Sequence, residues 1–163
     1  MTDPTALHAA VTTLLRELVD GAAGDACWVL NPGDPGLLRS LGTLSAVAAS
    51  APAPGGGPSI AAHVDHLRYG LQLMNRWSQG ENPFDNADYG ASWRRLRVSD
   101  QEWATLRDQL GAEAHRWLGV VRQARSLTDF ELTGMLASVV HLAYHLGAVR
   151  QINRSTRGPA ARD

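Results

Sequence analysis

Two histidines, His141 and His145, are the residues of this sequence whose type and spacing point most directly to chemistry. They lie in a stretch, residues 132–149, that contains no Asp, Glu, Lys or Arg. Residues four apart on a helix lie on the same face, so the two imidazoles can reach one point. The pair therefore predicts part of a transition-metal site, although core histidines bonded to backbone carbonyls can have the same spacing.

A third ligand is available in the segment 59–79, which carries His63 and His66. Metal sites that do chemistry usually take three protein ligands and leave a position open for water or substrate. On a helical wheel His63 lies near the middle of the apolar arc, and His66 lies towards its edge, where a cavity could admit substrate. From the residues alone, either histidine can complete the site.

The histidines must be positioned by helices, because apolar residues recur with helical period in four segments. Capping boxes begin two of these segments, at Ser99–Glu102 and at Thr128–Glu131. The Pro- and Gly-rich stretch 25–59 predicts a long crossover that covers one end of the bundle. We therefore expect an all-α four-helix bundle with long crossover connections. It forms one domain over residues 1–163, with a frayed tail at 154–163, and its helices are predicted at 4–20, 59–79, 99–124 and 128–150.

Composition narrows the chemistry further. The formal net charge of −1 gives no electrostatic case for nucleic acid or an anionic membrane as partner. All 15 basic residues are arginine, which excludes lysine Schiff-base chemistry. The single cysteine, Cys27, can form neither an internal disulfide nor a cysteine-rich zinc cluster, so a cytoplasmic location is expected. No signal peptide or membrane-spanning stretch is predicted, and residues 132–149 are read as a buried bundle helix.

The segments 59–67 and 141–147 together resemble the DinB/YfiT-like family of helical-bundle metalloproteins, the second through that family's HxxxHxG pattern. The resemblance covers nearly the whole chain, in helix order as well as in motif. It implies a divalent transition metal, zinc, nickel or iron, held by His66, His141 and His145. One position departs from the pattern, because Ala148 stands where many members have glutamine after the glycine.

The resemblance also implies a function, which is transfer of a low-molecular-weight thiol such as bacillithiol or mycothiol to an electrophile. An open metal site suits that reaction, because it lowers the pKa of a bound thiol. His63 and Tyr144 are then candidates to orient the ligands or handle protons, and a homodimer is expected. Because a ligating histidine must be neutral, metal occupancy should fall below about pH 6.

Two alternatives stay open at this point. One is a non-catalytic metal-binding stress or regulatory protein of the same fold. The other is a helical dimerisation module with core histidines and no metal. The chain can be an enzyme, a metal-dependent thiol S-transferase, but the sequence does not decide whether it is one.

Overall fold

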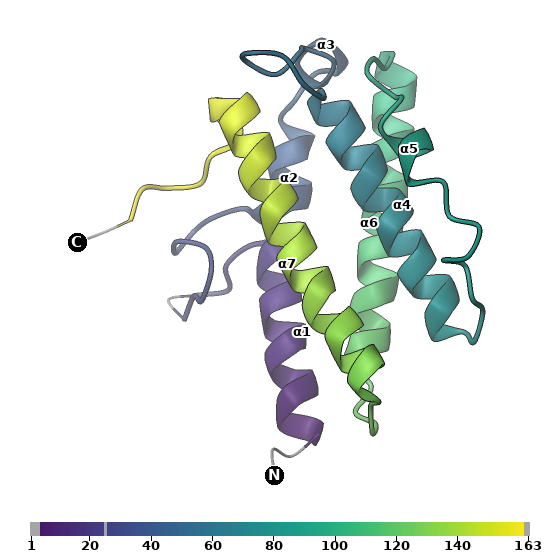
Figure 1. Ribbon diagram of the computed structural model, residues 1–163. Coiled ribbons are helices and arrows are strands. Elements are labelled where there is room, and N and C mark those ends of the chain that lie inside the picture. The colour runs from purple at the N-terminus through teal and green to yellow at the C-terminus, as the bar shows by residue number, and fades with distance from the viewer. Residues whose placement is uncertain (1–3, 25, 162–163) are drawn as a thin grey trace.

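The computed structural model describes residues 4–24 and 26–161, and the regular secondary structure in those ranges is helical. Four long helices stand side by side (Figure 1) and each packs along two of the others. They are α1 (Pro4–Asp20), α4 (Ile60–Ser78), α6 (Asp100–Val121) and α7 (Asp129–Ile152). The all-α prediction is confirmed, and each predicted long helix ends within a few residues of its expected position.

Local hydrogen bonds set where the helices begin. The Ser99 hydroxyl accepts a hydrogen bond from the backbone N–H of Glu102 at 3.3 Å, and the Glu102 carboxylate accepts one from Ser99 N–H at 2.7 Å. Thr128 and Glu131 form the same reciprocal pair at the start of α7. Both capping boxes predicted from the sequence are thus present, and they satisfy backbone donors that have no partner within the helix. In the sequence, Asp3 directly precedes Pro4 and is therefore the expected N-cap of α1, but it lies outside the described residues.

The long connection between α1 and α4 contributes to the core as well as crossing the bundle. It contains two short helices, α2 (Gly36–Gly42) and α3 (Ala46–Ala49). Helix α2 packs against α1 and α6, and its Leu37 and Leu41 are fully buried. A further short helix, α5 (Tyr89–Ser92), interrupts the connection between α4 and α6 and packs against α4.

Helix α7 is not buried on all sides, contrary to the prediction. It contacts α1 and α4 through one face, while apolar side chains on its other face meet solvent. Those exposed side chains are Phe130, Leu136, Val140 and Tyr144. By length and composition α7 could span a membrane, and 28% of its most apolar window is buried in the bundle. One such helix is weak evidence for a span, because bundle helices pass the same test.

The C-terminal segment makes defined contacts where a frayed tail was predicted. A 3₁₀ turn, η1 (Arg154–Thr156), follows α7, and Thr156 is buried. Asn153 caps this turn by accepting a hydrogen bond from Ser155 N–H at 3.0 Å. Further along, the Asn31 amide donates to the carbonyl oxygen of Pro159 at 2.7 Å. These contacts hold the segment against the bundle as far as residue 159.

Candidate metal centre

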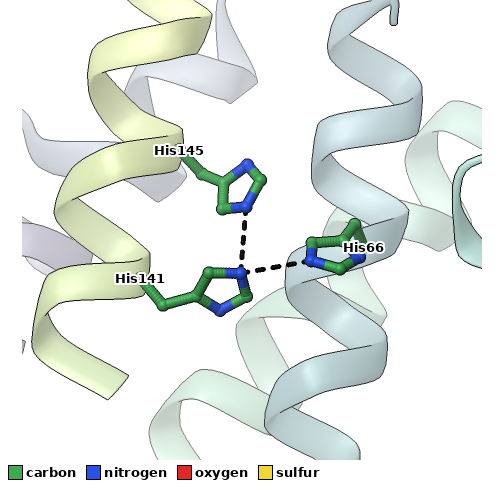
Figure 2. Close-up of side chains that lie close together, drawn as sticks. All are labelled: His66, His141 and His145. Atoms are coloured by element: carbon green, nitrogen blue, oxygen red, sulfur yellow. Dashed lines mark hydrogen bonds between the residues drawn. The ribbon is translucent and has the colours of Figure 1, made fainter. Parts of the chain in front are cut away.

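Three histidine rings converge between α4 and α7. Figure 2 shows His66 facing His141 and His145 across the space between the two helices. The Nε2 atom of His141 lies 3.2 Å from Nε2 of His66 and 3.0 Å from Nε2 of His145. Each ring offers one nitrogen to a group whose members all lie within 4.8 Å of one another. The structure therefore brings together the three residues predicted as ligands.

The helix geometry explains this convergence. His141 and His145 are one turn apart on α7, and α4 packs directly alongside. Gly70 on α4 faces the ring of His141, and a Cβ atom at residue 70 would lie 3.4 Å from Cε1 of His141. That separation is an ordinary contact for a methyl group, but a longer side chain would occupy the space of the ring. A small residue at this position leaves room for His141 between the helices.

Ser92, at the end of α5, determines which nitrogen of His66 is free. Its hydroxyl donates to the carbonyl oxygen of Tyr89 at 2.8 Å, so its oxygen is left to accept a hydrogen bond. Nδ1 of His66 lies 3.0 Å from that oxygen, and we assign the ring proton to Nδ1. The lone pair of His66 is then on Nε2, the atom that faces His141. Metal-ligating histidines are usually oriented by a hydrogen bond of this kind at the other ring nitrogen.

His63 lies behind the three rings and contacts one of them. Its Nδ1 is 2.8 Å from Nδ1 of His145, and the side chain is buried. If Nε2 of His145 supplies a lone pair to the cluster, the ring proton of His145 is on Nδ1. Nδ1–H of His145 then donates a hydrogen bond to Nδ1 of His63. The orienting role of His63 stays a prediction, and this contact is the geometry that the role requires. Tyr144, the other predicted neighbour, packs its ring edge-on against His145 with 5.0 Å between centroids and is otherwise exposed.

Sequence reasoning missed Trp93 and misplaced Asp65. The Trp93 ring stacks on His66 at 4.3 Å between centroids and meets His63 edge-on at 5.2 Å. Asp65 falls opposite the apolar arc of the segment 59–79, a position that predicts exposure to solvent. In the structure it is buried and accepts hydrogen bonds from Arg68 and Arg95, each at 2.8 Å. Arg95 follows Trp93 by two residues, so this ion pair fastens the connection onto α4 beside the histidines. Only an unusual Trp-Arg-Arg run in a loop signalled this segment in the sequence.

A divalent transition metal fits this donor set better than hydrogen bonding does. Nε2 of His141 faces two other Nε2 atoms, but a single ring nitrogen carries either one proton or one lone pair. One proton on His141 can satisfy only one of its two neighbours well, whereas a cation accepts all three lone pairs. Metal–nitrogen bonds of about 2.0–2.1 Å place neighbouring ligand atoms about 2.9–3.4 Å apart, for right-angled to tetrahedral arrangements. The observed separations of 3.0 and 3.2 Å lie within that range.

The electrostatics keep these imidazoles neutral. Burial lowers the pKa of His63 and of His141 from the ordinary histidine value. Burial, followed by the neighbouring His141 and His63, lowers the pKa of His66 to about 4. Burial, followed by His141, His63 and His66, lowers the pKa of His145 to about 3. The lone pairs of His66 and His145 are therefore free of protons well below pH 6, and protons should displace a metal from these two residues at a lower pH than from ordinary histidines.

The same pKa values predict how the stability of the metal-free protein depends on pH. Between about pH 6.5 and pH 4 the unfolded chain binds protons on His66 and His145 that the folded chain does not, so stability falls as pH falls. The melting temperature of metal-free protein should therefore decrease from pH 7 to pH 4.5. In His145→Gln the decrease should be smaller, because one of the shifted groups is absent. Equal decreases in thermal melts of the two proteins would contradict these assignments.

Comparison with known proteins identifies a family. A family model described as the DinB superfamily matches residues 35–149, more than half of the chain. The matched range begins just before α2, ends near the end of α7 and contains all four clustered histidines. No curated protein and no solved structure matches the chain.

Proposed function

Because this chain belongs to the DinB superfamily, we propose that it is a metal-dependent enzyme that transfers a bacillithiol- or mycothiol-like thiol to an electrophile. The observation that carries the proposal is the convergence of three Nε2 atoms, from His66, His141 and His145. A divalent zinc, nickel or iron ion bound there would lower the pKa of a thiol, so that the nucleophilic thiolate is present at neutral pH.

The chain's own residues supply binding and orientation. His66, His141 and His145 offer lone pairs that need not lose a proton first at neutral pH, given the direction of their pKa shifts. The Ser92 hydroxyl oxygen accepts a hydrogen bond from Nδ1–H of His66, and this bond directs the Nε2 lone pair of His66 towards the cluster. The stacked Trp93 ring excludes water from one face of His66. Such supporting contacts are what a preorganised site requires.

A pocket next to the cluster favours catalysis over a structural metal. A cavity of about 200 Å³ borders His141, and its other walls are contributed by α4, α7 and the connection that follows α4. Structural metal sites are closed by protein ligands, whereas catalytic sites keep access for water or substrate. This cavity supports the enzyme reading over the non-catalytic metal-binding protein.

The test combines metal analysis with a thiol-consumption assay. Protein purified without chelator should contain close to one divalent transition metal per chain, and it should consume a bacillithiol or mycothiol analogue in the presence of some member of an electrophile panel. His141→Ala should lose both properties, while His115→Ala should keep both, because His115 is exposed and pairs with Asp20 away from the cluster.

Three outcomes separate the functions. Metal together with thiol consumption supports the enzyme. Metal without consumption of any thiol tested identifies the non-catalytic metal-binding protein. A chain that is metal-free and cannot be reloaded with zinc, nickel, cobalt or iron identifies the helical dimerisation module.

We also propose that this protein forms a homodimer and is located in the cytoplasm. The outward apolar face of α7, with Phe130, Leu136, Val140 and Tyr144 exposed, supports a second copy as partner. A two-fold axis would pair this face with itself and remove it from water. Sedimentation should show a dimer that Val140→Glu converts to monomer, and a monomeric wild-type protein would exclude the dimer.

A further inference from the structure

We propose that the cavity beside His141 binds a compact apolar group, aryl or branched alkyl, of the electrophilic substrate. This inference names the substrate class of the site described above and rests on its proposed function. The cavity, called here the α4–α7 pocket, is lined by Leu67, Leu71, Met74, Phe84, Gly134 and His141 among other residues. It opens between two helices that also carry the three clustered histidines.

The chemistry of the lining favours apolar ligands. Among the residues that the structure describes, no Asp, Glu or Arg side chain lines the α4–α7 pocket. The hydroxyl of Ser138, one of its few polar groups, is already engaged. It accepts a hydrogen bond from Nε1 of Trp117 at 2.9 Å and donates one to the carbonyl oxygen of Met135 at 2.7 Å. Tyr89 and His141 are the other polar side chains of the lining, and the rest of the wall offers a polar group no partner. An apolar group, in contrast, gains by leaving water.

The size of the pocket selects a small ring or its equivalent. Its volume is about 200 Å³. An apolar cavity of roughly 150 Å³ in another protein stays dry and binds benzene, so this volume suits one aromatic ring with a short substituent.

Two glycines on facing helices create this space. Gly70 on α4 and Gly134 on α7 both line the pocket. A Cβ atom at residue 134 would lie 3.3 Å from the Trp77 ring and 3.5 Å from Cε of Met74. Glycine inside a helix costs about 0.5–1 kcal/mol relative to alanine. The pocket gives a reason for that cost, because side chains at these positions would fill it.

His141 connects the α4–α7 pocket to the cluster. Its ring forms part of the pocket wall, while its Nε2 faces His66 and His145. An aryl group in the pocket would therefore lie against the His141 ring, and a carbon attached to the aryl ring can point along His141 towards Nε2. For a benzylic halide, the sulfur–carbon bond would form as the carbon–halogen bond breaks, and halide would leave with the electron pair. Benzylic electrophiles are thus the substrate class that the geometry favours.

Fluorobenzene is the probe for this pocket. Its binding is measured by ¹⁹F NMR in metal-loaded and in chelator-treated protein. Both forms should bind it saturably. Gly134→Leu should weaken binding by about tenfold or more, because the leucine occupies the pocket. Gly119→Leu is the matched control, since residue 119 lies on the exposed side of α6 and a Cβ there meets nothing within 4 Å. Should Gly134→Leu fail to fold, Ala137→Trp fills the pocket from its surface side.

Either of two results would overturn the inference. One is wild-type protein that shows no saturable fluorobenzene binding. The other is a folded pocket-filling variant that binds the probe as well as Gly119→Leu does. Because the probe needs neither metal nor thiol, failure of the proposed function leaves this measurement unaffected. In an active enzyme, Gly134→Leu should also raise KM for benzyl bromide by about tenfold, whereas Gly119→Leu should not.

Discussion

Replacing His66 with alanine should reduce metal affinity by far more than 100-fold, whereas replacing His63 should reduce it by about 10–100-fold. His66 directs Nε2 at the cluster, so its loss leaves two of three ligands. His63 contacts the cluster through Nδ1 of His145 and therefore orients a ligand without being one. A competition titration with a zinc indicator measures both effects, and circular dichroism verifies that each variant is folded.

His115→Ala is the control for these substitutions, because it removes an exposed imidazole that pairs with Asp20. Its zinc affinity should equal that of the wild type. The opposite ranking, with His63→Ala the more damaging, would place the ligand at His63. The metal would then lie nearer the 2.8 Å contact between Nδ1 of His63 and Nδ1 of His145.

Removing the metal should abolish thiol consumption while leaving the helices intact. The core does not depend on the histidine cluster, since each long helix contributes buried leucines to it, such as Leu15, Leu67, Leu110 and Leu142. A metal present at 1,000 times its dissociation constant stabilises the folded state by about 4 kcal/mol. For a domain of this size, that corresponds to a decrease in melting temperature on the order of 10 °C after chelation.

The measurements are thiol consumption, far-ultraviolet circular dichroism and thermal melts, before and after treatment with a chelator. Adding zinc back should restore the melting temperature, and magnesium should not, because imidazole is a poor ligand for magnesium. Complete unfolding at room temperature on chelation would show that the metal holds the fold together. Unchanged thiol consumption in demonstrably metal-free protein would remove the metal from the mechanism.

The pocket and the exposed face of α7 were not predictable from the sequence. The charge-free segment 132–149 predicts a helix buried on all sides, yet the side chains of Val140 and Tyr144 are exposed to solvent. Amino-acid composition shows that a helix is apolar. How many other helices pack around it depends on its position in the bundle. The pocket likewise depends on Gly70, which faces His141, and on Gly134, which faces Trp77 and Met74. The two glycines lie more than 60 residues apart in the chain.

What the sequence determined by itself was local. Helical periodicity and the capping boxes at Ser99 and Thr128 predicted the long helices, because these signals act within one or two turns of the chain. The same regularity placed His141 and His145 on one face. Resemblance and the edge position of His66 then favoured it over His63, and the structure directs Nε2 of His66 at the cluster.

Which residues distant in sequence contact and orient the histidines depends on tertiary packing. Ser92 reaches His66 across 26 residues, and the ion pair between Asp65 and Arg95 spans 30. No periodicity relates a loop residue to a helix face that far away in sequence. Such contacts follow from how α4, α5 and α7 pack, and packing depends on the shape of the whole core rather than on any one segment.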